Sequence, residues 1–202
     1  MSALAALVAY AIGAVPVGWV VARAFGVSDI RRQGSGNIGA TNVLRTVGRG
    51  PAVVTLAGDV LKGYLAVAAG AALGAGDLTA VAVATVAAVV GNCWSVFLRF
   101  RGGKGVATGL GALLHTAPLA TLAALPVFVA VVASTRYVSL ASLLAAACVP
   151  LGAILLGYPR SSVLAALGVA VIVIARHHAN IARLRAGTES RFGQRGDAHR
   201  AA

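Results

Sequence analysis

The sequence predicts an all-α integral membrane protein with about seven transmembrane helices. It is 59% hydrophobic and 11% charged, with a mean hydropathy of +0.88. An ordinary soluble domain has roughly 25% charged residues. The apolar residues also gather in long runs, which a soluble fold of this size could not cover with polar surface. We therefore expect one polytopic membrane domain over residues 1–202.

Seven apolar runs define the expected helices. A helix needs about 20 residues to cross the hydrocarbon core, so the fourth and fifth runs are short. Pro118 between them could separate two short spans or break one bent helical unit, which leaves six helices as the alternative. No basic residues precede the first run, so we interpret it as a retained span and not as a cleaved signal peptide. The runs are 3–22, 51–74, 78–98, 105–116, 119–134, 137–157 and 161–176.

The positive charge indicates an orientation. With the N-terminus outside and the C-terminus cytoplasmic, fifteen of the 17 Lys and Arg residues fall on the cytoplasmic side, as the positive-inside rule requires. Lys62, within a span, and Arg160, outside, are the two exceptions. This distribution explains much of the net charge of +12 without nucleic acid, since most aromatic residues lie in apolar runs. The tail at 183–202 is expected to be a basic, partly mobile cytoplasmic segment near anionic headgroups.

The first polar stretch is GSGNIGATNVLR at residues 34–45. It contains Gly34-x-Gly36-x-x-Gly39, formally a dinucleotide fingerprint, with Asp59 20 residues beyond Gly39. That fingerprint requires a preceding strand and a βαβ unit, whereas here a membrane span follows, so we reject a nucleotide-binding fold.

The glycines of this stretch still favour an anion site. Glycine permits positive φ, so successive N–H groups can point into one concavity. A mere turn between two helices is the alternative, but a turn does not need this set of polar side chains. Arg45 adds a guanidinium suited to phosphate. The neutral donors are Ser35, Asn37, Thr41 and Asn42.

The second polar stretch, LRFRGGKGVAT at residues 98–108, presents Lys104 among glycines at the expected start of a helix. Helix N-termini favour anions. The spacing is not that of a Walker A loop. A lysine at the membrane edge that contacts lipid phosphates is the alternative. The candidate contacts here are Gly102, Gly103, Lys104, Gly105 and Thr108.

The third stretch, RHHANIARLRAGTE at residues 176–189, ends the last run. His177 and Asn180 are three residues apart and therefore share a helix face. A neutral His177 could donate to a phosphate or accept a hydroxyl proton. His178 points elsewhere. Two adjacent histidines without nearby cysteines or spaced carboxylates predict no metal site, and no cofactor is expected. The isolated Cys93 and Cys148 are expected to be buried free thiols.

Asp59 and Lys62 form the one opposite-charge pair inside a predicted span. Intramembrane charges are expensive and usually functional, and here each residue can be the partner of the other. A structural brace near the site is the preferred interpretation, with a direct catalytic role as the alternative.

These stretches resemble the bacterial acyl-phosphate:glycerol-3-phosphate acyltransferase family. The resemblance extends in order over nearly the whole chain. Two departures stand out: the family usually has GHxFP where this chain has Gly91-Asn92-Cys93-Trp94-Ser95, and Lys or Arg where this chain has His178. The matching segments are GAVPVGW at 13–19, SDIRRQGSGNIGATNVLR at 28–45, GDVLKG at 58–63, FLRFRGGKGVAT at 97–108 and HxxNIxRLxxGTE at 177–189.

The resemblance implies a bacterial inner-membrane enzyme with its site on the cytoplasmic side. It would transfer a fatty acyl group from acyl phosphate to the sn-1 hydroxyl of glycerol 3-phosphate, giving lysophosphatidic acid and phosphate. Beyond these substrates and membrane lipids, no nucleic acid and no obligate protein partner is expected. This chain also lacks the HxxxxD motif of other glycerol-phosphate acyltransferases.

We assign Ser35, Arg45 and Lys104 mainly to the glycerol 3-phosphate. Asn37, Thr41, His177 and Asn180 are placed near the acyl phosphate or shared between the substrates. The proton could pass to His177 or to the leaving phosphate. A transporter or channel for a phosphate-bearing solute is the rival class, although transporter sites tend to lie at the membrane midplane between repeated halves. A structural lipid-binding protein would explain the charge but not the three motifs.

Overall fold

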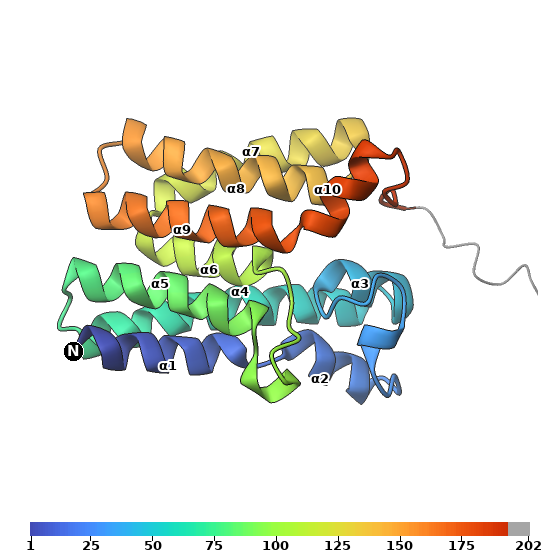
Figure 1. Cartoon of the computed structure of the whole chain (residues 1–202), viewed down its shortest axis with the longest axis horizontal. Helices are drawn as coiled ribbons and strands as arrows, with labels where there is room; N and C mark the ends of the chain where they lie inside the picture. The colour runs from blue at the N-terminus through green and yellow to red at the C-terminus, as the bar shows by residue number, and fades with distance from the viewer. Residues whose placement is uncertain (194–202) are drawn as a thin grey trace, which may run out of the picture.

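A computed structural model of the chain describes residues 1–193, which are helical with connecting turns and contain no strand. Figure 1 shows the long helices side by side along one axis. The short helices at 30–46 and 178–185 lie together at one end of the bundle. The α-helices are α1 Ser2–Ala14, α2 Val17–Ala24, α3 Ala40–Thr46, α4 Arg49–Leu73, α5 Leu78–Cys93, α6 Val106–Thr116, α7 Pro118–Thr135, α8 Val138–Leu155, α9 Arg160–Arg176 and α10 His178–Arg185, and the short 3₁₀ helices are η1 Ile30–Arg32 and η2 Val96–Leu98.

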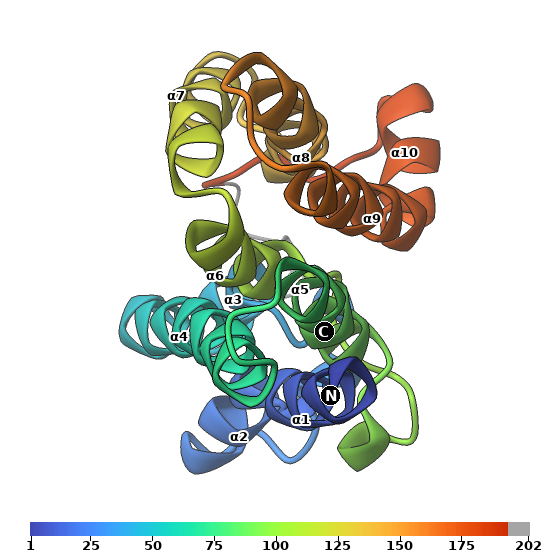
Figure 2. The ribbon, with the colours of Figure 1, turned by 90° about the vertical axis from the view of Figure 1, so that its left-hand side faces the viewer.

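The helices form two groups that meet at α5 and α6. Figure 2 shows α1, α2 and α4 on one side and α7, α8 and α9 on the other. α1 packs against α4 and α5, α4 packs against α6, and α9 packs against α5 and α8. The functional end of the bundle therefore draws its residues from both groups.

Small residues let the helices approach closely, as is common between membrane helices. A Cβ atom at Gly63 of α4 would overlap the carbonyl oxygen of Thr108 on α6. A Cβ at Gly111 of α6 would in turn overlap the carbonyl oxygen of Val60 on α4. The two backbones are thus in direct contact, which fixes the start of α6 against α4.

The predicted all-α membrane architecture is confirmed, but fewer than the seven predicted helices are long enough to span a membrane. All seven predicted runs are helical, yet α6 has 11 residues. At 1.5 Å per residue it covers roughly 16 Å, about half the hydrocarbon core. Within residues 1–193, five stretches are long and apolar enough to cross, and α9 with α10, bent by 59°, could form a sixth. The five are Ser2–Ala24, Arg49–Leu73, Leu78–Leu98, Pro118–Thr135 and Val138–Leu155.

Two predicted boundaries also change. The first run breaks at Val15 and Pro16, because proline lacks the N–H that would continue the helix. The third run ends as an α-helix at Cys93, and its last residues form a turn and η2. Pro118 separates α6 from α7 and occupies the first position of α7, where a missing N–H costs little.

The C-terminal segment folds back onto the turn between α7 and α8. The Phe192 N–H donates to the Arg136 carbonyl oxygen at 2.6 Å. The Arg191 guanidinium lies 5.4 Å from the ring centroid of Tyr137. The predicted basic tail at 183–202 therefore begins inside α10, and its residues 194–202 lie outside the described part of the chain.

Candidate active site

The loop before α3 is shaped by the Asn42 side chain. Asn42 is 1% exposed, and its Oδ1 accepts from the Ser35 N–H at 2.8 Å. Its Nδ2 donates to the carbonyl oxygens of Gln33 at 3.0 Å and Asn37 at 2.8 Å. Gly34 has φ +56°, and a Cβ there would overlap Asn42 Oδ1. We predicted that Asn42 contacts substrate, but its hydrogen-bonding groups are occupied within the loop, so it braces the loop.

The predicted backbone anion cradle of this loop is only partly present. The Ser35 N–H is taken by Asn42, and the Gly39 N–H donates to Asn37 Oδ1 at 2.8 Å. The side chains of Ser35 and Arg45 are exposed and make no hydrogen bond within residues 1–193. A ligand bound at this loop would therefore contact side chains more than backbone N–H groups.

The second loop is packed against the end of α5. The Gly102 N–H donates to the Cys93 carbonyl at 3.2 Å, and the Gly103 N–H donates to the Asn92 carbonyl at 2.9 Å. Arg176 Nε donates to the Gly103 carbonyl at 3.1 Å. The N–H groups of Gly102 and Gly103, which we expected among the substrate contacts, therefore already have partners within the fold. They are glycines because a Cβ at Gly102 would overlap Asn92 and one at Gly103 would crowd it.

Lys104 and Gly105 follow this packed segment and lead into α6. Gly105 has φ +81°, a left-handed conformation that suits glycine, and it forms the N-cap of α6. The first-turn N–H groups of α6 have no intrahelical partner. Thr108 lies four residues after Lys104 and is buried, and its hydroxyl makes no hydrogen bond within residues 1–193. Thr108 stays a predicted ligand contact.

A chain of hydrogen bonds joins Lys104 to the third stretch. Lys104 Nζ donates to Asn180 Oδ1 at 2.6 Å, and Asn180 Nδ2 donates to Glu189 Oε1 at 2.6 Å. Glu189 also accepts from Ser139 Oγ at 2.8 Å and pairs with Arg183 Nε at 2.7 Å. The hydrogen bond between Lys104 and Asn180 confirms that the second and third motifs lie together.

Sequence reasoning gave no role to Glu189 or Ser139. Glu189 is the only acid between residues 177 and 193, a stretch with several arginines. A lone acid in a basic segment is a signal that could have identified it. Ser139 offers no such signal, since it is one small polar residue at the start of an apolar run.

His177 lies at the bend between α9 and α10 and is 3% exposed. Its Nδ1 is 2.7 Å from the Val173 carbonyl oxygen. That carbonyl can only accept, so Nδ1 carries the proton and Nε2 of the neutral ring is left as an acceptor. Burial is the main factor that disfavours a positive charge on His177, and the nearby Lys104 and Arg176 add to it. His178, which we expected to point elsewhere, is exposed.

The electrostatics of the site favour a phosphate. The pKa of Lys104 is lowered to about 8, mainly by burial; Glu189 opposes this shift, and the nearby Arg183, Arg45 and Arg176 contribute to it. Burial would raise the pKa of Glu189, but hydrogen bonds from Asn180, Ser139 and Arg183 hold it below its usual value. One carboxylate among four cations leaves a net positive site, which suits a dianion.

The Asp59–Lys62 pair supports this site from inside the bundle. Lys62 Nζ is 2.6 Å from Asp59 Oδ1, so each is the partner of the other, as predicted. Lys62 Nζ also donates to the Val15 carbonyl at 2.7 Å and to Asn92 Oδ1 at 3.0 Å. The Asn92 carbonyl in turn accepts from the Gly103 N–H. The ion pair on α4 is therefore linked to the break between α1 and α2 through Val15, and to the GGKG loop through Asn92.

The fold and site define a polytopic helical membrane protein with a cationic, phosphate-compatible centre built from three motifs at one end of the bundle. The family model described as glycerol-3-phosphate acyltransferase matches residues 3–187. The chain belongs to this family.

Similar proteins agree with this membership. The glycerol-3-phosphate acyltransferase of Geobacter sulfurreducens is 51% identical over 185 residues, covering 92% of this chain and 94% of the relative. Glycerol-3-phosphate acyltransferase 2 of Moorella thermoacetica is 51% identical over 192 residues, covering 95% and 98%.

Two crystal structures of the integral membrane glycerol 3-phosphate acyltransferase PlsY share the fold. The glycerol 3-phosphate form has a TM-score of 0.89 at 36% identity and covers 95% of this chain and 96% of that one. The lysophosphatidic acid form has a TM-score of 0.87 at 35% identity, with 95% of each chain covered.

Proposed function

We propose that this protein transfers a fatty acyl group from acyl phosphate to the sn-1 hydroxyl of glycerol 3-phosphate. The products are 1-acyl-glycerol 3-phosphate, which is lysophosphatidic acid, and inorganic phosphate, in the first step of phospholipid synthesis. Family membership and relatives crystallised in glycerol 3-phosphate and lysophosphatidic acid forms support the acceptor and product. The observation that carries the proposal is half-buried Lys104, held by Asn180 among arginines.

In the proposed reaction, the acceptor hydroxyl oxygen attacks the acyl carbonyl carbon. A C–O ester bond forms, the bond from the carbonyl carbon to the phosphate oxygen breaks, and phosphate leaves. Acyl phosphate is already activated, so alignment and screening of the two dianions supply much of the rate. Neither a covalent acyl-enzyme nor a metal or cofactor is part of this proposal.

We propose a role for each of the site residues. Ser35, Arg45 and Lys104 bind the phosphate of glycerol 3-phosphate with side chains that are exposed or face the cationic centre. Asn37, Thr41 and Asn180 lie near the acyl phosphate or are shared between the substrates. His177 Nε2 is the acceptor for the hydroxyl proton, because Nδ1 is engaged by Val173; the leaving phosphate is the alternative acceptor.

We further propose that the chain is a single membrane domain of the bacterial inner membrane. Its N-terminus lies outside, and its site and C-terminus are cytoplasmic. The positive-inside distribution supports this orientation, and the three basic motifs gather at the same end of the bundle (Figure 1).

A single assay tests the function. Purified protein is given acyl phosphate and glycerol 3-phosphate, and released phosphate and lysophosphatidic acid are measured. Equal amounts of both products are expected, with no turnover when acyl-CoA replaces acyl phosphate. Absence of phosphate release, together with flux of glycerol 3-phosphate into liposomes, would instead establish the transporter class.

A further inference from the structure

A basic cavity borders the site described above, and none of the residues that line it was assigned a role in that site. Its volume is about 460 Å³. Figure 2 shows its η2 loop, in green, on the outer flank of α1, on the opposite side of the bundle from α9 and α10. We call this cavity the flank pocket; it is lined by Trp19, Arg31, Phe97, Leu98, Arg99 and Arg101.

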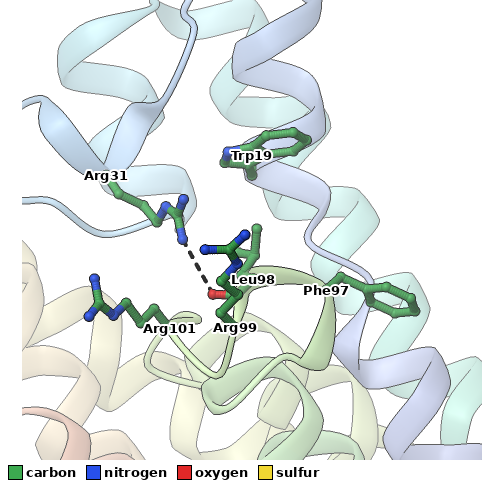
Figure 3. Close-up of a pocket in the computed structure, with 6 residues that line it drawn as sticks. All are labelled: Trp19, Arg31, Phe97, Leu98, Arg99 and Arg101. Carbon is green, nitrogen blue, oxygen red and sulfur yellow. Dashed lines mark hydrogen bonds between the residues drawn. The ribbon is translucent and has the colours of Figure 1, made fainter.

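The charges of the flank pocket are largely uncompensated. Arg31 pairs with Asp29 at 2.7 Å and donates to the Leu98 carbonyl at 3.4 Å, shown by the dashed line in Figure 3. Arg99 and Arg101 are exposed and make no ion pair within residues 1–193. In Figure 3 the guanidinium groups of Arg31 and Arg99 both point into the space below the Trp19 ring. Like charges held together in this way attract an anion.

A neighbouring cavity extends the same basic surface. It has a volume of about 510 Å³ and shares Arg31 and Arg101 with the flank pocket. It adds Arg32 and reaches the active site at Gly36, Gly102 and Arg176. Among residues 1–193, Asp29, already paired with Arg31, is the only acid that lines either cavity. Arginine is the side chain best matched to phosphate oxygens, because its planar guanidinium can form two parallel hydrogen bonds.

Apolar and aromatic groups surround this charge. Phe97 and Phe100 are 61% and 60% exposed. The Trp19 indole Nε1 is buried and makes no hydrogen bond within residues 1–193, which leaves a donor at the wall of the pocket. Exposed aromatics beside arginines are typical of the membrane–water interface.

The backbone of the loop is strained to present these side chains. Arg99 has φ +54° and Phe100 has φ +62°, two consecutive non-glycine residues in the left-handed region. Such residues cost free energy and gather where function requires them. Here the strained pair places a guanidinium and an aromatic ring on the same outward-facing loop.

We propose that the flank pocket binds the phosphate of an anionic phospholipid from the surrounding membrane. Arg31, Arg99 and Arg101 contact the headgroup phosphate, and Trp19 Nε1 donates to a headgroup oxygen. Phe97 and Phe100 lie among the acyl chains. A lipid fits better than a free phosphate compound because the cationic groups share the site with exposed aromatic surface.

Binding is measured by native mass spectrometry of the purified full chain in a neutral detergent. Phosphatidylglycerol is titrated against phosphatidylcholine of equal chain length, and inorganic phosphate is a separate competitor. The variants are Arg99→Gln, Arg99→Gln with Arg101→Gln, and Trp19→Phe. Arg160→Gln, at the start of α9, is the matched control because it removes one arginine far from the pocket. Thermal unfolding of each variant identifies any that fail to fold.

The wild type is expected to prefer phosphatidylglycerol at least tenfold over phosphatidylcholine. The double variant should lose at least tenfold in affinity, since each basic residue near an anionic surface contributes about a fivefold factor. Trp19→Phe should lose about twofold to fivefold, and Arg160→Gln should change little. The proposal is overturned by equal affinity for the two lipids, by equal losses in the control, or by complete displacement with inorganic phosphate. No substrate is turned over, so the outcome is independent of the acyltransferase assay.

Discussion

Two buried or half-buried lysines near the same loop are held in opposite ways. Lys62 is 6% exposed and bonded to a carboxylate, a backbone carbonyl and an amide oxygen. Lys104 has one neutral hydrogen-bond partner, Asn180, and arginines nearby. The charge of Lys62 is satisfied by the fold, whereas the charge of Lys104 is left for a ligand. The same residue type therefore acts as a brace at Lys62 and, in our proposal, as a phosphate ligand at Lys104.

The largest expected effect that tests this contrast is on turnover. Lys104→Ala should lower kcat/KM by at least about a thousandfold, because it removes the one ammonium at the centre of a phosphate site. Melting temperature should stay near that of the wild type, since the fold does not depend on this charge. Both are measured on protein in detergent, with Lys104→Arg as the charge-conserving control. Near-normal turnover of Lys104→Ala would contradict the assignment.

The two adjacent histidines provide the next test. His177→Ala should lower kcat by about 10²–10⁴-fold if Nε2 accepts the proton, as is typical of a general base. His178→Ala is the matched control, because that ring is exposed and its one hydrogen bond within residues 1–193 is with the Ala175 carbonyl. Its activity should stay within about twofold. A loss below tenfold in His177→Ala would assign the proton to the leaving phosphate.

The brace is tested by stability. Lys62→Met leaves Asp59 buried without its partner, which should cost about 3–5 kcal/mol. The double variant Asp59→Leu with Lys62→Met should recover most of that loss, because no charge is then left unpaired. Thermal unfolding in one detergent compares the three proteins. A double variant less stable than Lys62→Met would mean that the pair has a role beyond mutual compensation.

The smallest expected effect is a pH dependence. The pKa of Lys104 is lowered to about 8, mainly by burial, so the ammonium is complete at lower pH and is lost as pH rises through about 8. kcat/KM for glycerol 3-phosphate should therefore fall above this pH.

A substitution at Glu189 tests whether Lys104 causes this pH dependence. Glu189 raises the pKa of Lys104, so Glu189→Gln should move the descending limb to lower pH. Rates are measured from pH 6.5 to about 10 with acyl phosphate saturating. A limb that does not move would show that another group causes it, and melting temperatures report whether the variant keeps its fold.

The three motifs of the proposed site could be recognised in the sequence because they are dense in polar residues within an apolar chain. Their placement on one side followed from the charge asymmetry. The sequence could not show which of these polar groups form hydrogen bonds within the fold and are therefore not available to a ligand. Asn42 was expected to contact the ligand, but its side chain forms hydrogen bonds within its own loop. The N–H groups of Gly102 and Gly103 donate to carbonyl oxygens at the end of α5. The sequence around a residue shows that a hydrogen-bond donor is present, but it does not show which acceptor that donor binds.

The sequence alone therefore determined the helical membrane architecture, the three motifs and the family, since hydropathy, charge and residue type are local properties. The tertiary structure decided which lysine is paired with a carboxylate, how α6 falls short of a span and where Glu189 lies. Lys104 and Asn180 are 76 residues apart and meet at 2.6 Å. Such contacts arise from the packing of distant helices, and packing depends on the whole chain.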